Sequence, residues 1–533
     1  MDSSCISYKD TGFFSPTVIK YLEDAPDLRS FYSYRPTMEG FAELFNNKKV
    51  IADRELLAKV LTNQYFDNEK GKSHNAQTVL ANIELLKSAD TFTVTTGHQL
   101  NIFAGPLYFI YKIVTAIKLA RQLKESFPDK NFVPVYWMAS EDHDFAEINY
   151  TNIGGKKVHW WYEASGATGR INPDTMRQAL NQYKGVLGLD GYALELGEIV
   201  STAYTKFDKL ADATRYMVDA LFGQYGLVII DADDHELKKQ FAPIIEQDII
   251  EQNSFKHITE TNKLLQAVDV HIQVNPREIN FFYLKDSLRE RVVFEDNLYK
   301  VLNTEIAFTE AELKQEIATY PERFSPNVVM RPLYQEMILP NIAYIGGGAE
   351  VVYWLELKAN FDHYKVDFPI LILRNSGLIV LKEYTPKIAK MGLRPQDFFK
   401  PTDELKNDWI KQNTDKDLSL ETEWTQLEGI FENIKQRAYA IDPTLSPSAA
   451  AVQARLKHAM DNLEKKFTRA EKRNYSTRLE QIDYIKADLF PKDSLQERTE
   501  NFGLFYVKWG QFFIEELIRN FQPLAFEFSI LAE

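Results

Sequence analysis

The sequence predicts an α/β protein: a doubly wound parallel sheet of about five strands, with two inserted subdomains and a long α-helical coiled-coil hairpin. Three observations lead to this prediction. Short apolar runs recur along the first part of the chain, helical patterns follow most of them, and a highly charged segment with almost no glycine occupies positions 401–500. Strands that alternate with helices form right-handed crossovers, which place helices on both faces of a parallel sheet.

Five apolar runs have the composition of strands that are buried on both faces. They lie at 91–96, 132–139, 226–231, 341–346 and 369–374. A helical pattern follows the first run over 105–126, the third over 233–252 and the fourth over 349–366. We expect these strands and helices to form the core of the fold.

Two intervals between the strands are longer than a plain crossover requires, so we expect each to hold an insertion, near 151–225 and near 253–325. Within the first, the stretch 156–171 alternates and turns like a β-hairpin. Within the second, the stretch 280–295 has two strand-like runs around a polar turn. Both insertions should lie near the carboxyl edge of the sheet.

These patterns divide the chain into four parts. We expect a helical N-terminal segment that packs on the core (1–90), a Rossmann-like core with its insertions (91–380), an α-helical coiled-coil domain (381–505), and a C-terminal segment that returns to the core (506–533).

The predicted coiled coil rests on residues 401–500, which contain 35 charged residues and one glycine, Gly429. Apolar residues recur there in steps of three and four, as in the seam between packed helices: Val452, Leu456, Met460, Leu463, Phe467 and Ala470, then Leu479, Ile482, Ile485 and Leu489. Pro443 and Pro447 mark a turn before this stripe. We expect a projecting helical hairpin that joins two copies into a homodimer, with a helical bundle packed on the sheet as the alternative.

The composition limits the function. The chain of 533 residues has a net charge of −14, which disfavours nucleic-acid binding because phosphate backbones attract Lys and Arg. The single cysteine, Cys5, can form no internal disulfide and excludes cysteine-rich zinc sites. Residues 1–14 lack the apolar centre of a signal peptide, and no apolar run is long enough to span a membrane. We expect a cytoplasmic protein that binds neither nucleic acid nor membrane.

The loop after the first strand leads into a helix that begins near Gly105 and Pro106. Proline suits the first turn of a helix, and glycine lets a ligand approach the backbone. Free amides at such a helix start form an anion site at the carboxyl edge of the sheet, although the loop could also be only a tight strand–helix turn. The expected nucleotide-binding residues of this loop are Thr96, Gly97, His98, Gln99, Gly105 and Pro106.

Acidic residues follow the second and third strands: Glu141, Asp142, His143 and Asp144 after the second, and Asp231 and Asp233 after the third. Carboxylates and an imidazole at a strand's carboxyl end can orient hydroxyl groups, bind a divalent ion or move protons. The alternative is helix capping, by Ser140 or Asp142 in the first group and by Asp233 or Asp234 in the second. Capping is the stronger alternative after the third strand.

The last two strands also end in polar loops. Three glycines, Gly346, Gly347 and Gly348, come before a helix that begins near Glu350 and could form a backbone nest for a carboxylate or phosphate. After the fifth strand, Arg374 could neutralise phosphate charge that develops in a transition state. Further polar residues follow at Asn375 and Ser376, and Arg331 lies near the start of a helix ahead of the fourth strand.

Four stretches, in order, resemble the BshC family, the cysteine ligases of bacillithiol biosynthesis. They are "TGHQLNIFAGPLYFIYKIVTAIKLA", "VPVYWMASEDHDFAEIN", "SPNVVMRPLYQEMILPNIAYIGGGAEVVYWLELK" and "LRNS". The resemblance extends over most of the chain. The core of this family is similar to class I aminoacyl-tRNA synthetases; 103–106 falls at the place of their first signature motif and 374–376 at the place of their mobile basic loop.

The resemblance implies the last step of bacillithiol biosynthesis, an amide bond between the carboxylate of cysteine and the amine of glucosaminyl-malate. It implies ATP, with Mg²⁺, as the activating cosubstrate. The nine histidines are scattered and give no spacing typical of a protein-bound metal. Asp142 or Asp144 would orient the nucleotide, the sugar or the magnesium ion, and Arg374 would meet the leaving phosphate. A carboxylate or a histidine near His143 would take a proton from the attacking amine.

The remaining roles are expected from position. The glycines 346–348, with Asn375 and Ser376, would contact the nucleotide. The expected substrate-binding residues are Glu141, Asp231, Asp233, Glu350 and Arg331. Two other functions stay open: a metal-dependent hydrolase that uses the acidic clusters, and a non-catalytic nucleotide-binding scaffold whose hairpin binds a partner.

Overall fold

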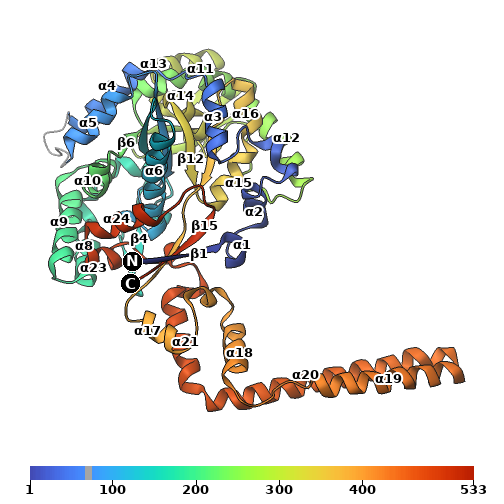
Figure 1. Cartoon of the computed structure of the whole chain (residues 1–533). Helices are drawn as coiled ribbons and strands as arrows, with labels where there is room; N and C mark the ends of the chain where they lie inside the picture. Colours follow the sequence, from blue (N-terminus) through green and yellow to red (C-terminus); the bar gives the residue numbers. More distant parts are fainter. Residues whose placement is uncertain (67–74) are drawn as a thin grey trace. The chain divides into compact units, whose positions relative to one another are not determined.

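The computed structural model describes residues 1–66 and 75–533 (Figure 1). The chain forms two compact units. The first consists of Met1–Leu378 with Leu495–Leu531, and the second consists of Ile379–Ser494 with Ala532–Glu533.

The core of the first unit is a five-stranded parallel sheet, which confirms the predicted fold class. Its strands lie in the order β13-β12-β2-β3-β6. They are β2 (Thr91–His98), β3 (Asn131–Met138), β6 (Val228–Asp231), β12 (Asn341–Gly346) and β13 (Ile370–Leu373). β-Branched and aromatic residues fill these strands and are buried at nearly every position, as expected for a sheet covered on both faces.

The strand order reverses between β2 and β12. The chain runs from β2 through β3 to β6 in one direction, and from β12 to β13 in the other. In doubly wound sheets, ligands bind outside the carboxyl ends of the strands at such a reversal. The loops after β2 and β12 are therefore the expected position of a ligand site.

Helices follow the strands as the sequence indicated. They are α6 (Leu107–Ser126) after β2, α11 (His235–Glu251) after β6, α14 (Arg331–Ile338) before β12, and α15 (Gly348–Glu356) with α16 (Lys358–Tyr364) after it. Helix α6 begins at Leu107, so Pro106 is its N-cap residue and lies just outside the helix. Asp234 caps α11 by accepting a hydrogen bond from the amide of Leu237 at 3.1 Å, one of the two capping residues proposed for this helix.

The N-terminal segment is mostly helical. Its elements are β1 (Asp2–Ser7), α1 (Tyr8–Thr11), α2 (Pro16–Leu22), α3 (Met38–Asn47), α4 (Arg54–Phe66) and α5 (Ala76–Leu85). Phe41 and Leu44 of α3 are buried in the same cluster as Phe92 and Val94 of β2. The segment thus closes one face of the core sheet.

The first insertion contains a hairpin that lies earlier than the predicted stretch 156–171. Strands β4 (Tyr150–Ile153) and β5 (Lys156–His159) pair around Gly154 and Gly155, whose φ angles are +55° and +74°. Only glycine adopts such angles at little cost, so these glycines, and not those at 166 and 169, make the turn. The short helix α7 (Phe145–Ile148) comes before the hairpin, and α8 (Arg177–Leu187), α9 (Gly191–Lys206) and α10 (Leu210–Phe222) follow it.

The second insertion is built around an antiparallel sheet. The predicted hairpin is present as β7 (Phe281–Lys285) and β8 (Leu288–Glu295). The whole sheet has the order β10-β9-β8-β7-β11, with β9 (Leu298–Val301), β10 (Ala307–Phe308) and β11 (Phe324–Pro326). Helices α12 (Asn253–Gln266) and α13 (Glu310–Thr319) flank it.

The last part of the first unit follows the helical unit in sequence. Helices α22 (Gln496–Thr499) and α24 (Gln511–Asn520) pack on α6, and α23 (Gly503–Trp509) packs on α9. Residues 495–505, which the sequence analysis assigned to the helical domain, therefore lie in the first unit. Strand β15 (Glu527–Ala532) takes the centre of a three-stranded sheet of order β1-β15-β14, where β14 is Gly377–Val380.

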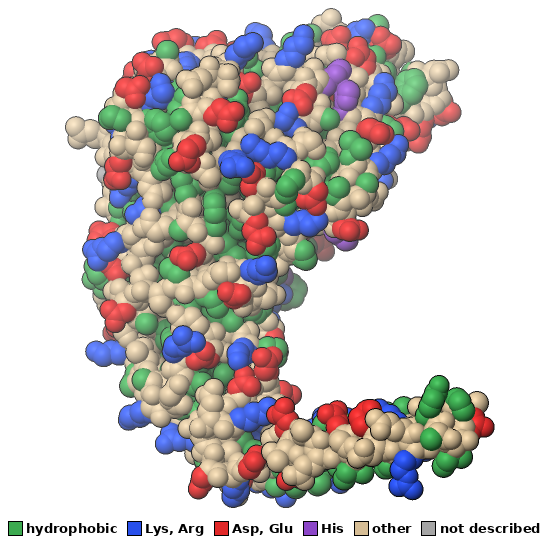
Figure 2. All heavy atoms as spheres, turned by 45° about the vertical axis from the view of Figure 1, so that its right-hand side comes forward, with side chains coloured by type: hydrophobic (Ala, Val, Ile, Leu, Met, Phe, Trp, Pro, Cys, Tyr) green, Lys and Arg blue, Asp and Glu red, His purple; other side chains and the backbone are tan. Residues whose placement is uncertain are grey.

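The second unit is helical and contains the predicted hairpin. Its helices are α17 (Thr385–Lys390), α18 (Thr402–Asn413), α19 (Glu421–Ile441), α20 (Ser446–Asn474) and α21 (Ser476–Leu489). Helices α19 and α20 pack against each other around a short turn at Pro443–Leu445. Trp424 and Phe431 of α19 are buried, whereas Val452 and Leu463 of the α20 stripe remain 45% and 42% exposed. Figure 2 shows hydrophobic side chains on the surface of the hairpin.

No helix among the described residues is both long enough and apolar enough to cross a membrane.

Candidate functional site

The polar loops predicted from the sequence come together at the carboxyl edge of the parallel sheet. They fall into two groups. One surrounds the ends of β2, β12 and β13, and the other surrounds the ends of β3 and β6. Gln99, just past β2, joins the two groups, because its amide nitrogen donates to Asp142 at 2.6 Å and to Glu147 at 2.8 Å.

Lys112 and Glu350 are at the centre of the first group. The ammonium of Lys112, from α6, lies 2.5 Å from the Glu350 carboxylate and donates to the carbonyl of Gly97 at 2.8 Å. Glu350 also accepts from the amide of Gly347 at 2.7 Å and from the hydroxyl of Tyr344 at 2.8 Å. The predicted glycine nest after β12 is thus partly filled by the chain's own carboxylate.

Among the described residues, no carboxylate forms an ion pair with Arg331, and Glu350 acts on it only at longer range. Its guanidinium lies over the rings of Trp137 and Tyr344, 5.7 and 5.6 Å from their centroids, and donates to Gln335 at 2.9 Å. Its Nη2 is buried without a hydrogen-bond partner among the described residues, although the side chain of Tyr353 also interacts with the guanidinium. A buried cationic donor of this kind is costly unless an anion reaches it.

Arg374 is tied to the segment after the helical unit. Its guanidinium lies 2.7 Å from the carboxylate of Glu497, donates to the hydroxyl of Ser376 at 3.0 Å, and lies 5.3 Å from the ring centroid of Tyr108. The backbone amide of Asn375 donates to the hydroxyl of Thr115 on α6. The loop after β13 is therefore fixed by several contacts.

His98 packs against α6 and is uncharged. Burial, reinforced by the neighbouring Lys112, lowers its pKa to about 3. Its ring lies against Phe109, with 5.1 Å between centroids, and its Nε2 is buried without a hydrogen-bond partner.

The helix start predicted to bind phosphate has its first amide occupied. The amide of Leu107 donates to the carbonyl of Glu500 at 2.8 Å, and the side-chain amide of Asn501 donates to the carbonyl of Gly105 at 2.7 Å. Gly105 has a φ of +55°, and a Cβ at this position would lie 2.7 Å from the Cβ of Asn101. The structure thus explains this glycine by local packing, whereas the sequence analysis attributed it to a ligand. Nucleotide binding by Thr96, Gly97, Gly105 and Pro106 stays a prediction.

The second group is acidic. The carboxylate of Asp142 accepts from the backbone amides of His143 and Asp144 at 2.7 and 3.3 Å. This holds the loop after β3 in a turn without capping α7, and Asp144, the N-cap residue of that helix, makes no side-chain cap hydrogen bond. Asp144 is exposed, so its carboxylate is open to a ligand.

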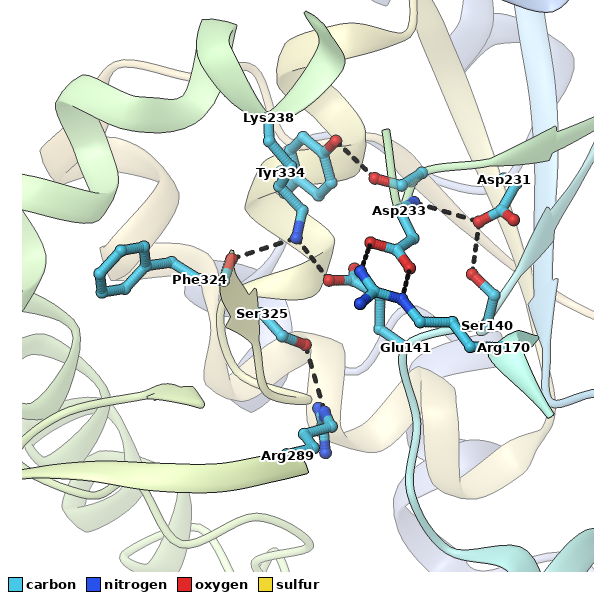
Figure 3. Close-up of polar contacts among 11 residues, drawn as sticks. Ser140, Glu141, Arg170, Asp231, Asp233, Lys238, Arg289, Phe324, Ser325 and Tyr334 are labelled. Carbon is cyan, nitrogen blue, oxygen red and sulfur yellow. Dashed lines mark hydrogen bonds and ion pairs between the residues drawn. The ribbon is translucent and has the colours of Figure 1, made fainter. Parts of the chain in front are cut away.

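Three other carboxylates of this group form ion pairs or hydrogen bonds with side chains of the protein (Figure 3). Glu141 forms an ion pair with Lys238 of α11, which also donates to the carbonyl of Phe324 at 3.1 Å. Asp233 accepts two hydrogen bonds from Arg170, at 2.8 and 2.9 Å. Asp231 accepts from the hydroxyl of Ser140, and burial followed by the charge of Asp233 raises its pKa.

His143 meets an arginine from the second insertion. Nη1 of Arg289, on β8, lies 2.5 Å from Nδ1 of His143. Burial, and then the charge of Arg289, lower the pKa of His143, so its imidazole is neutral at pH 7. Among residues 1–66 and 75–533, no group of three or more His, Cys, Asp or Glu side chains is arranged to hold a metal ion.

Comparison with known protein families gives the decisive observation. Residues 1–375 match the N-terminal Rossmann-like domain of bacillithiol biosynthesis BshC, and residues 377–533 match its C-terminal coiled-coil domain. The chain belongs to the BshC family. This confirms the resemblance seen in the four sequence stretches.

Curated BshC relatives are similar over their whole length. A protein of Flavobacterium psychrophilum named "Putative cysteine ligase BshC" is 42% identical over 100% of this chain and 99% of its own. A protein of the same name from Flavobacterium johnsoniae is 41% identical over 100% of both chains, and one from Bacillus cereus is 25% identical over 94% of this chain and 95% of its own. A solved structure from Campylobacter jejuni, titled "putative arginyl t-RNA synthetase", is 10% identical over 87% of this chain and 96% of its own, with a TM-score of 0.22.

The sequence analysis of this BshC-family chain found Arg331 and Arg374 but missed four other cations of the site. Lys112 and Lys238 lie inside helices, and Arg170 and Arg289 lie in the two insertions. A lysine within a helical pattern normally points to solvent, so these residues gave no strong signal. One weak signal was available for Lys112: it interrupts an otherwise apolar helix, in which a charge must have a partner.

Proposed function

We propose that this BshC-family enzyme is a ligase that uses ATP to join the carboxylate of cysteine to the amine of glucosaminyl-malate, the last step of bacillithiol biosynthesis, in the cytoplasm. The names of the curated relatives support a cysteine ligase. The observation that carries the proposal is the separation of charge along the carboxyl edge of the sheet. Cations lie in the first group, around the ends of β2, β12 and β13 (the cationic group), and carboxylates lie in the second group, around the ends of β3 and β6 (the acidic group).

The cationic group suits the activation of a carboxylate. A carboxylate does not condense with an amine at neutral pH unless its oxygen becomes a leaving group, and transfer of a nucleotide or phosphoryl group from ATP achieves this. Arg331, which forms no ion pair among the described residues, supplies positive charge that would attract phosphates and stabilise negative charge as it develops. Lys112 and Arg374 are the neighbouring cations, each paired with a carboxylate of the chain. Magnesium would enter bound to the nucleotide.

The acidic group suits the amine. Asp142, Asp144 and Glu147 lie on or beside the loop after β3, and none of them forms an ion pair with a Lys or Arg of the described residues. They would attract the ammonium of the glucosamine part and take its proton before attack. Because Gln99 connects both groups, the amine and the activated carboxylate would meet above the end of β2.

The test is amide formation by the purified protein with ATP, cysteine and glucosaminyl-malate, measured by mass spectrometry of the product. We expect product only when all three are present, with one equivalent of AMP or ADP. ATP binding without product would support the nucleotide-binding scaffold, and metal-dependent cleavage of the product would support the hydrolase.

A matched pair of variants tests the separation of charge. Arg331→Met should raise the KM for ATP or cysteine and leave that for glucosaminyl-malate nearly unchanged, whereas Asp144→Asn should do the opposite. We expect about tenfold or more in each affected KM, which corresponds to about 1.4 kcal/mol. Equal effects of both variants on all three KM values would contradict the assignment.

A further inference from the structure

Arg289 reaches from the second insertion to the loop after β3. Its Nε donates to the hydroxyl of Ser325 on β11 at 3.2 Å, and its guanidinium lies 4.0 Å from the ring centroid of Phe282 on β7 (Figure 3 shows Arg289 with Ser325). The ring of His143 lies 5.4 Å from the same phenyl ring. Two contacts within the inserted sheet thus aim the Arg289 guanidinium at Nδ1 of His143.

This contact fixes the position of the proton on His143. Arginine stays protonated in proteins, and all five of its N–H groups are donors. At 2.5 Å, Nη1 of Arg289 can form a hydrogen bond with Nδ1 of His143 only if Nδ1 carries no proton. The neutral imidazole must then carry its proton on Nε2.

The other edge of the His143 ring faces away from this contact. The side chain is 49% exposed, and no described residue forms a hydrogen bond with Nε2. The charged groups around the ring are Asp142 and Asp144 on its own loop, and Arg289 and Glu290 on β8. The Nε2–H is therefore a donor that no described residue uses, on the loop that carries Asp144 of the proposed amine site.

We propose that Arg289 is a positioning residue that holds His143 as a hydrogen-bond donor, through Nε2, to an oxygen of the bound substrate. This inference rests on the proposed ligase function. It reassigns His143, which the sequence analysis considered as a proton acceptor: the lone pair that a base needs is already used by Arg289. The proton of the attacking amine then goes to a carboxylate, and Asp144 is the exposed carboxylate beside His143.

Two substitutions of His143 separate donor, base and structural roles. Glutamine places an N–H near the position of Nε2 but loses the contact with Arg289. Asparagine places an oxygen near Nδ1, which keeps that contact, but it loses the distal donor. We expect His143→Gln to retain kcat/KM within about tenfold and His143→Asn to lose about 10²–10³-fold, the usual cost of removing a donor to a developing charge.

The opposite order, with asparagine active and glutamine inactive, would show that the contact is only structural. A loss of 10²-fold or more in both variants is the result expected of a general base. Either outcome would overturn the proposal.

The role of Arg289 is tested by the pH profile of kcat/KM. In the wild type, activity should fall at a pH below the ordinary histidine pKa of about 6.5, because a protonated His143 keeps its Nε2–H but adds a positive charge that repels the ammonium of the amine substrate. Arg289→Met removes the neighbouring cation, so the pKa of His143 should rise. The fall of activity on the acid side of the pH profile (the acid limb) should then move to higher pH. Arg289→Lys keeps a cation and a donor and should restore the wild-type limb. An unchanged limb in Arg289→Met would contradict the positioning role.

A measurement on the resting protein keeps this inference separate from the proposed function. In protein labelled with ¹⁵N-histidine, the His143 signals are identified by their loss in His143→Gln. The proposal expects an unprotonated Nδ1 and a protonated Nε2 in the wild type at pH 7.5. A proton on Nδ1 overturns it, whether or not the enzyme forms the amide. Absence of amide formation with the expected tautomer would instead count against the ligase function.

Discussion

His98 shows at the scale of one residue how burial sets chemistry. The sequence places it at the carboxyl edge of the sheet, where a titrating histidine would be plausible. Burial against α6, and then the charges of Lys112 and Arg374, lower its pKa to about 3, although the Glu350 carboxylate acts in the opposite direction. Such a group is neutral throughout the physiological range, so it can donate or accept a hydrogen bond but does not exchange protons near pH 7.

The low pKa of His98 predicts a loss of stability in acid. The unfolded chain binds a proton at about pH 6.5, but the folded chain does so only near pH 3. Unfolding therefore takes up a proton between these values, and the free energy of unfolding falls as the pH falls from 6.5 toward 3. Between pH 7 and pH 5.5, the loss from this residue should be about 1 kcal/mol.

Urea denaturation of the wild type and of His98→Gln at both pH values isolates this contribution. Buried carboxyl groups such as Glu336, whose pKa is raised to about 7 by burial, act in the opposite direction but are common to both proteins. The stability advantage of the wild type should shrink at pH 5.5. An advantage that is the same at both pH values would mean that His98 is not buried in solution. His271→Gln, at an exposed position, is the matched control.

The hairpin of α19 and α20 leaves large apolar side chains exposed to solvent. The seam between the two helices buries Trp424 and Phe431. Apolar side chains on other faces remain exposed, near the tip and along both helices (Figure 2): Ile430, Ile434, Tyr439, Ile441, Leu445, Val452 and Leu463. Contiguous exposed apolar side chains of this size usually mark an interface.

We propose that the exposed apolar side chains of the hairpin join two copies of the chain. The sequence analysis predicted the homodimer from the stripe on α20; the structure shows that α19 covers part of that stripe, and it adds Ile430 and Ile434, which are 53% and 40% exposed. A variant with Ile430→Glu and Ile434→Glu should be a folded monomer in light scattering, with about half the wild-type mass and unchanged helical circular dichroism.

The control for this experiment adds the same charges elsewhere on α19. Gln426 and Gln436 are exposed polar residues of that helix, and the variant Gln426→Glu with Gln436→Glu should remain dimeric. A wild-type protein that is monomeric at micromolar concentration would contradict the proposal, as would a dimer that survives the isoleucine substitutions.

At the scale of the whole molecule, the division into two units predicts how a nucleotide affects stability. Every predicted nucleotide-binding residue lies in the first unit. A ligand that binds only the folded state stabilises it by about 2.7 kcal/mol at a hundredfold excess over its Kd. We therefore expect ATP to raise the unfolding temperature of the first unit and to leave that of the helical unit unchanged.

Hydrogen exchange measured by mass spectrometry with and without ATP can follow both units at once. Slower exchange should be confined to the first unit, and strongest in the loops after β2, β12 and β13. A uniform slowing that includes α19 and α20 would contradict binding within the first unit alone.

The sequence by itself determined the order and type of the elements. Apolar runs of strand length predicted all five core strands, because a strand buried on both faces must be apolar at nearly every position. The three-and-four spacing after Pro447 predicted the hairpin for a similarly local reason. The acidic loop after β3 and the arginine after β13 were also found, since they follow directly on strands.

Only the tertiary structure decided which charged side chains form ion pairs within the protein and which remain available to a ligand. Glu141 and Asp233 carry the same charge in the sequence as Asp144, but Lys238 and Arg170 neutralise them from distant parts of the chain. The same applies to Gly105, which the packing of Asn101 explains, and to His143, whose proton Arg289 places from a strand 146 positions away in sequence. Strand and helix patterns depend on neighbours a few residues apart, whereas these side-chain states depend on contacts that folding alone creates.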